Sequence, residues 1–141
     1  MDPLAHPIVS RFRLHRIHYK QMRYHAERFN HREVCGIVSG INGVSIRVFE
    51  IKNWANSPTR FLMEPTEQLK VFQHLERVKQ HILAIYHSHP NQPSFPSTID
   101  IQEAYYPNAL NLIWSQINGY WMCQAYYIRN RKIKEIPIKI I

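Results

Sequence analysis

The hydrophobic positions near the start of the chain follow helical spacing. Apolar side chains recur three or four positions apart, with charged residues between them, at Tyr19, Met22, Ala26 and Phe29. This period predicts an amphipathic helix over residues 18–28 whose apolar stripe lies in the core. The preceding residues 14–17 predict a short strand.

The pattern then changes to that of paired strands. Apolar-rich segments over residues 34–39 and 44–52 flank Asn42-Gly43, a dipeptide typical of tight hairpin turns. Glu33 stands directly before the first segment, so we expect it to open that strand. A further short strand is predicted over residues 60–63.

The middle of the chain predicts a second helix and a buried strand. Pro65 suits the first position of a helix that ends near Lys79. Its apolar side is predicted to consist of Leu69, Phe72, Leu75 and Val78. A continuous apolar run at residues 82–86 is typical of a strand buried on both faces. The prolines at positions 90, 93 and 96 end that strand and predict a loop, before a short helix over residues 98–105.

The last third predicts three more strands, over residues 110–115, 120–128 and 133–140. Turns are expected at Asn118-Gly119 and Asn130-Arg131. Strands joined by hairpins, with helices between them, predict an α/β fold with a mixed, mostly antiparallel sheet covered by helices. A length of 141 residues suits a single domain over residues 1–141.

Composition and charge narrow the class of protein. Apolar residues make up 45% of the chain and charged residues 20%, as in ordinary globular proteins. The apolar runs of the chain are far shorter than the roughly 18 residues that span a membrane, and residues 1–10 lack a secretory signal. We therefore expect a cytoplasmic protein.

Cys35 and Cys123 are expected to be reduced, buried thiols. A net charge of +8 favours an acidic partner, and the basic clusters at residues 11–32 and 129–134 are expected to be solvated surface.

Two histidines one residue apart, His87 and His89, follow the apolar run. Successive side chains of a strand alternate, so both imidazoles point to the same side and can bind one ion. Ser97 is expected to cap the next helix, which brings the carboxylate of Asp100 back towards the histidines. Two imidazoles and one carboxylate, with a fourth position open, are the ligands of a catalytic zinc site.

These residues resemble the signature of the JAMM, or MPN-plus, metalloprotease family, H-[ST]-H-P-x6-S-x2-D. Here it reads, without a departure in spacing, His87-Ser88-His89-Pro90, Ser97, Asp100. The segment that begins at Glu33 is similar to the family's upstream element E-x-C-G-[IL]-x-x-G, and further agreement lies in residues 56–65 and 106–113. One departure is His31-Arg32, where a proline is expected. The resemblance covers residues 14–140.

The resemblance implies a zinc-dependent peptidase or isopeptidase with a curved, cytidine-deaminase-like sheet flanked by two helices. It implies that His87, His89 and Asp100 bind Zn²⁺, that Glu33 is the catalytic carboxylate and that Ser97 stabilises the oxyanion. The chain has no long insertion after Asp100, like small prokaryotic members that act on ubiquitin-like or sulfur-carrier proteins. The expected reaction is hydrolysis after a C-terminal Gly-Gly of such a protein.

Two other functions stay open at this point. The family includes non-catalytic scaffold proteins, although these lack the metal ligands. A metal-dependent nucleic-acid-binding protein would explain the basic charge, but the paired aromatic signatures of RNA-binding folds are missing, so nucleic acid is not the expected partner. The other seven histidines are predicted to be surface or helix residues, and Glu103 a solvated helix residue. The sequence leaves the oligomeric state open.

Overall fold

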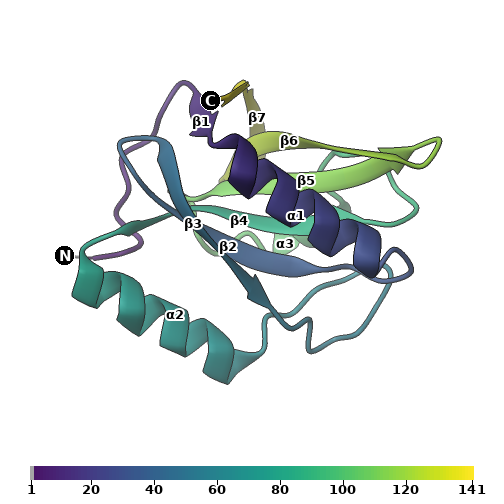
Figure 1. The fold of residues 1–141 in the computed structure, drawn as a ribbon, viewed down its shortest axis with the longest axis horizontal. Coiled ribbons are helices and arrows are strands. Elements are labelled where there is room, and N and C mark those ends of the chain that lie inside the picture. Colours follow the sequence, from purple (N-terminus) through teal and green to yellow (C-terminus); the bar gives the residue numbers. More distant parts are fainter. Residues whose placement is uncertain (1) are drawn as a thin grey trace.

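Eight strands form one curved sheet in residues 2–141, the part of the chain that the computed structural model describes (Figure 1). Along the chain the elements are β1 (Phe12–Leu14), α1 (Arg16–Arg28), β2 (Cys35–Ile41), β3 (Val44–Ile51), α2 (Pro65–Val78), β4 (His81–His89), α3 (Thr98–Gln102), β5 (Leu110–Ile117), β6 (Tyr120–Arg129), β7 (Lys132–Ile136) and β8 (Ile138–Ile140). The order in the sheet is β7-β6-β5-β4-β2-β3-β1-β8. Four of the seven pairings are antiparallel and three are parallel, which confirms the predicted mixed sheet.

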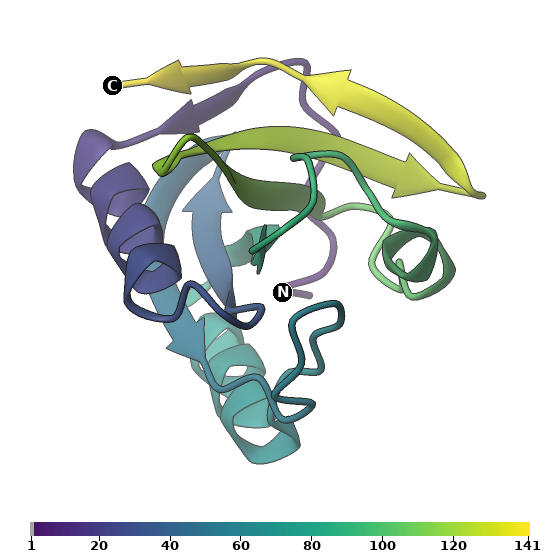
Figure 2. The same ribbon diagram turned by 90° about the vertical axis from the view of Figure 1, so that its right-hand side faces the viewer.

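The two faces of the sheet bury separate apolar clusters. Met22 and Ala26 of α1 pack on one face, together with Trp114 of β5. Leu75 of α2 packs on the other face, together with Ile85 of β4. Figure 2 shows β2 and β3 between the two helices. Because the side chains of a strand alternate between the two faces of the sheet, each helix packs against its own apolar cluster.

No helix in residues 2–141 has the length and apolar character needed to cross a membrane.

The predicted turns and helix ends agree with the structure. Asn42 and Gly43 have φ angles of 53° and 76°, the left-handed conformation that a two-residue hairpin requires. Pro65 begins α2, the carboxylate of Glu64 accepts hydrogen bonds from the amides of the first turn, and Lys79 ends the helix in the left-handed conformation. The local signals for turns and caps thus determine where these elements begin and end.

Several boundaries differ from the prediction. The first strand covers residues 12–14, and residues 60–63 form no strand because Met63 makes only an isolated bridge to Asn53. Glu33 lies two residues before β2. The helix α3 ends at Gln102, three residues earlier than predicted. On α2, Leu69 and Val78 are 56% and 42% exposed, so the predicted apolar side is wrong at both positions.

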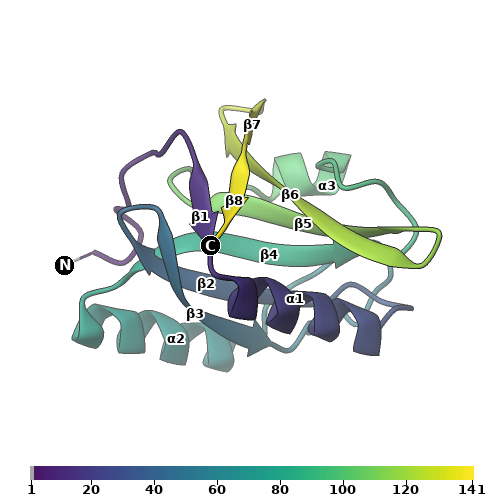
Figure 3. The ribbon, with the colours of Figure 1, turned by 45° about the horizontal axis from the view of Figure 1, so that its top comes forward.

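The predicted last strand is split at Pro137, which has no amide hydrogen to donate to a strand pairing. Residues before it form β7 beside β6, whereas residues after it form β8 beside β1 (Figure 3). The carbonyl of Pro137 accepts a hydrogen bond from the amide of Phe12 at 2.9 Å. The two outermost strands of the sheet are therefore joined by a single residue.

Candidate metal centre

The strand β4 carries His87 and His89 out of the middle of the sheet. It pairs with β2 on one side, where Cys35 is opposite His87, and with β5 on the other, where Ser115 is opposite His89. Both histidines are buried. A strand paired on both sides holds its side chains rigidly, as a metal site requires.

The short helix α3 brings Asp100 to the two imidazoles. Ser97 caps this helix as predicted, because its hydroxyl accepts a hydrogen bond from the amide of Asp100 at 3.1 Å and its own amide donates to Asp100 Oδ2 at 2.9 Å. The same Oδ2 lies 3.1 Å from the Nε2 atoms of both His87 and His89, and these two nitrogens are 3.0 Å apart. The structure thus brings together the three residues that the sequence proposes as metal ligands.

The pKa values of His87 and Asp100 suit a bound cation. Burial lowers the pKa of His87 more than the charge of Asp100 raises it. Burial also raises the pKa of Asp100, but the attraction of a protonated His87, the contacts with both imidazoles and the hydrogen bond from the Ser97 amide outweigh burial, so the pKa of Asp100 lies well below its usual range. A neutral imidazole and a carboxylate are the forms that bind metals.

Neighbouring groups fix the orientation of both rings. His89 Nδ1 donates a hydrogen bond to the carbonyl oxygen of Pro93 at 2.8 Å, which leaves the lone pair on Nε2, towards Asp100. The ring of Phe61 stacks on His87 with centroids 4.6 Å apart. A backbone carbonyl on the far nitrogen of a histidine is a typical support for a metal ligand.

The three ligand atoms fit a small divalent ion. Ligands at about 2.1 Å from a tetrahedral zinc ion lie about 3.4 Å apart, a few tenths of an ångström more than the 3.0–3.1 Å between these atoms. Three acceptor atoms that converge in a buried place need a shared cation or proton between them. Two nitrogens and one oxygen leave room for a further ligand, as in catalytic sites.

Glu33 is held beside this centre by its backbone. Its amide donates to the carbonyl of Ser57 at 2.8 Å, and its carbonyl accepts from Asn53 Nδ2 at 3.0 Å. The hydroxyl of Ser88, between the two histidines, accepts from the amide of Val34 at 2.8 Å. Ser88 therefore ties the segment of Glu33 to the strand of the metal ligands.

The carboxyl group of Glu33 is buried and lacks a full set of partners. The residue is 1% exposed, and its Oε1 has no hydrogen-bond partner among the described residues. Burial, with a smaller effect from the charge of Asp100, raises its pKa to about 9. A carboxyl group that holds a proton near neutral pH beside a metal centre is suited to proton transfer.

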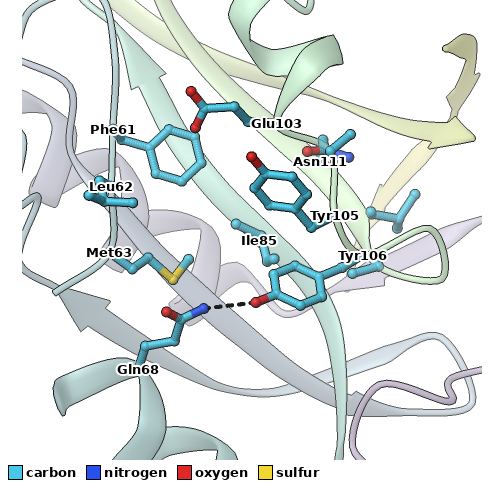
Figure 4. A pocket seen from close by; sticks show the side chains of 12 residues that line it. Phe61, Leu62, Met63, Gln68, Ile85, Glu103, Tyr105, Tyr106 and Asn111 are labelled. Atoms are coloured by element: carbon cyan, nitrogen blue, oxygen red, sulfur yellow. Dashed lines mark hydrogen bonds between the residues drawn. The ribbon is translucent and has the colours of Figure 1, made fainter. Parts of the chain in front are cut away.

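Figure 4 shows the side chains that line a cavity of about 240 Å³, and two of these residues connect the cavity with the metal centre. Its lining includes Ile85, two residues before His87 on β4, and Phe61, whose ring stacks on His87. Tyr106 closes another side and accepts a hydrogen bond from Gln68 Nε2 at 3.0 Å. The sequence does not indicate this cavity, because its walls come from separate segments, around residues 61–63, 68, 85 and 103–111, that only the fold brings together.

Two side chains outside the centre, Glu103 and His6, differ from the predictions, and a third, His25, agrees with its prediction but is buried. Glu103 is not simply solvated, since it forms an ion pair of 3.1 Å with Arg60. His6 is neither a surface nor a helix residue: it is buried, and its Nε2 accepts a hydrogen bond from the amide of Gly43 at 3.1 Å. His25 lies on α1 as predicted but is buried, and burial lowers its pKa to about 4.

Comparison with known proteins gives the family. The family described as prokaryotic homologs of the JAB domain matches residues 15–132. The chain belongs to this family. Its JAB domain is 31% identical to a desampylase of Pyrococcus furiosus over 109 residues, 77% of this chain and 76% of that protein.

Two further similarities cover more of the chain. A CysO-cysteine peptidase of Mycobacterium tuberculosis is 29% identical over 120 residues, 83% of this chain and 82% of that protein. The solution structure of a protein from Desulfitobacterium hafniense has a TM-score of 0.82 and 27% identity, with 92% of each chain covered. The fold of that structure therefore extends over nearly all of the described residues of this chain.

Proposed function

We propose that this JAB protein is a zinc-dependent peptidase or isopeptidase that hydrolyses the bond after the C-terminal Gly-Gly of a ubiquitin-like or sulfur-carrier protein. The observation that carries the proposal is the convergence of His87, His89 and Asp100, with ligand atoms 3.0–3.1 Å apart, beside the buried carboxyl group of Glu33. A scaffold protein has no need for such a group of buried polar atoms, whose burial is costly.

Zinc is the metal that the donor set favours. Imidazole nitrogen and carboxylate oxygen with an open position are typical of catalytic zinc, whereas calcium and magnesium prefer oxygen ligands alone. When bound, zinc would polarise the scissile carbonyl and increase the acidity of water at the site.

Glu33 would move the proton in this reaction. Its carboxyl group would lose its proton more readily next to a bound dication, because an opposite charge favours the charged form. The carboxylate would then accept a proton from the attacking water and deliver it to the leaving amine. The contacts of its backbone with Ser57 and Asn53 keep the group in place during both transfers.

Ser97 is proposed to stabilise the developing oxyanion. Its hydroxyl oxygen already accepts from the amide of Asp100, which leaves its hydrogen to be donated. Because the capping interaction holds Ser97 next to the proposed ligand Asp100, the hydroxyl would be within reach of a substrate carbonyl at the metal centre. A donor aimed at developing negative charge lowers the barrier of acyl transfer.

The family resemblance and the surroundings of the site support the proposed substrate. One relative carries the name CysO-cysteine peptidase. The cavity beside His87 offers an apolar groove, and an extended Gly-Gly tail can pass such a groove to the metal without side-chain clashes. The net charge of +8 would attract an acidic partner.

We also propose that the chain works as a single domain in the cytoplasm.

The proposal is tested with a panel of ubiquitin-like and sulfur-carrier fusions, including cysteine-extended forms. Zinc-loaded protein should cleave after Gly-Gly, and Glu33→Gln should reduce kcat roughly a hundredfold or more while keeping the metal. Replacing Gly-Gly by Ala-Ala should abolish cleavage. Bound zinc without cleavage of any fusion would favour a scaffold, and cleavage of nucleic acid instead would refute the peptidase assignment.

A further inference from the structure

The loop between the two elements that carry the metal ligands, residues 90–97, is held by side chains of β5 and β6. Gln116 of β5 donates to the carbonyl of Pro90 at 3.1 Å. On β6, the hydroxyl of Tyr126 donates to the carbonyl of Ser94 at 2.6 Å, and Gln124 accepts from the Ser94 hydroxyl. Gln124 and Tyr126 are two positions apart and so lie on the same face of β6. The middle of the loop is thus held at Ser94 by two neighbouring side chains of β6, one on its carbonyl and one on its hydroxyl.

Ser94 directly follows the residue that orients a proposed metal ligand. The carbonyl of Pro93 accepts the hydrogen bond from His89 Nδ1 at 2.8 Å. One Cα atom separates the peptide unit that contains this carbonyl from the peptide unit held by Tyr126. The orientation of the Ser94 carbonyl therefore limits the orientation of the Pro93 carbonyl.

We propose that Tyr126 is a positioning residue for the metal centre. Its hydroxyl, through the backbone of Ser94, holds the carbonyl of Pro93 against His89 Nδ1. This contact keeps the hydrogen of the imidazole on Nδ1 and its lone pair on Nε2, towards Asp100. The inference rests on the metal site of the proposed function, but it concerns a residue outside the signature of the family.

The surroundings of Tyr126 support a fixed rather than a mobile contact. The residue is 3% exposed. The ring of Phe95 packs edge-on against it with centroids 5.7 Å apart. Gln124 is itself oriented by a hydrogen bond of 3.1 Å to Glu135 on β7, so its oxygen faces Ser94. A buried hydroxyl with one short backbone acceptor has little freedom to change partners.

The adjacent residue provides a matched control. Tyr127 is also 3% exposed, but its hydroxyl accepts from the amide of Val9 at 3.0 Å, and its side chain belongs to the core cluster that contains Met22 and Ala26 of α1. Tyr126→Phe and Tyr127→Phe therefore each remove one buried hydroxyl that contacts a backbone group. Only the first removes a contact with the loop next to His89.

The experiment measures zinc affinity by chelator competition and the His89 tautomer by long-range ¹H–¹⁵N NMR of the metal-free protein. Tyr126→Phe should bind zinc about tenfold more weakly, the lower end of the effect of losing a group that supports a ligand. Its His89 should show a mixture of tautomers, whereas Tyr127→Phe should match the parent protein in both measurements. Ser94→Ala, which keeps the carbonyl and loses the contact with Gln124, should give a smaller loss of affinity.

The outcomes separate this inference from the proposed function. Absence of zinc binding by the parent protein would refute the metal centre itself. Zinc binding by the parent with unchanged affinity and tautomer in Tyr126→Phe would overturn only the role of Tyr126. Equal losses in Tyr126→Phe and Tyr127→Phe would also overturn it, because the effect would then follow from the loss of any buried hydroxyl.

Discussion

The buried carboxyl group of Glu33 should make the metal-free protein less stable as the pH rises. In the unfolded chain a glutamate loses its proton near pH 4.5, whereas burial raises the pKa of Glu33 in the fold to about 9. Between these values the folded protein holds one more proton than the unfolded chain. The free energy of unfolding therefore falls by about 1.4 kcal/mol for each pH unit in this window.

Glu33→Gln removes this dependence because an amide does not titrate. From pH 5.5 to 7.5 the titration of Glu33 should lower the free energy of unfolding of the parent protein by about 3 kcal/mol. The free energy of unfolding of the variant should therefore rise by the same amount relative to that of the parent over this range. Other titrating groups, including His87 and Asp100, are present in both proteins and largely cancel in the difference. A stability of about 5–15 kcal/mol is usual for a domain, so the change is large enough to measure.

The assay is urea unfolding in the presence of a chelator, followed by tryptophan fluorescence, because Trp114 and Trp121 are buried. Glu76→Gln, at an exposed position of α2, is the matched control and should differ from the parent by the same amount at every pH. A difference between Glu33→Gln and the parent that stays constant from pH 5.5 to 7.5 would refute the reasoning. Saturating zinc should reduce the pH-dependent difference, since a dication favours the carboxylate.

Three further changes have definite expected results. His89→Ala should lose the zinc that metal analysis finds in the parent, because it removes one of three ligands, and equal zinc in both proteins would count against the site. Gly36→Ala should lower the free energy of unfolding by about 3 kcal/mol or more in urea titrations, because its Cβ would lie 2.3 Å from the carbonyl oxygen of Phe49 and 2.3 Å from the ring of Tyr86. Cleavage of an acidic substrate should slow as ionic strength rises from about 0.01 M to 0.15 M, and a kcat/KM that does not change would mean that the basic surface plays no part in the encounter.

Most of the fold could be predicted because its signals are local. The hairpin at Asn42-Gly43 and the helix that begins at Pro65 depend on backbone preferences of one or two residues. The split of the last strand has a local signal in Pro137, but the partner of β8 does not, because β8 pairs with β1, more than 120 residues earlier in the chain. The apolar spacing along α2 also predicts burial of Leu69 and Val78, but both are exposed because the sheet covers only part of that helix.

The site shows the same division between local and distant signals. His87 and His89 share a strand, and the cap at Ser97 fixes Asp100, so their convergence follows from spacing alone. The contact of Phe61 with His87 joins segments 26 residues apart through an irregular loop. The hydrogen bond from the Tyr126 hydroxyl to the Ser94 carbonyl, in the loop before α3, likewise depends on the pairing of β6 within the sheet. No local pattern in the sequence encodes either contact.

The split of the last strand at Pro137 also bears on aggregation. An exposed sheet edge is a template for pairing with another chain. Here the edges consist of β7 with five residues and β8 with three, and each edge strand carries lysine, at Lys132, Lys134 and Lys139. Because one residue joins these two strands, a single short segment protects both edges of the sheet from pairing with another chain. Strand-to-strand association of neighbouring molecules is thereby disfavoured at both edges by the same nine residues of the chain, 132–140.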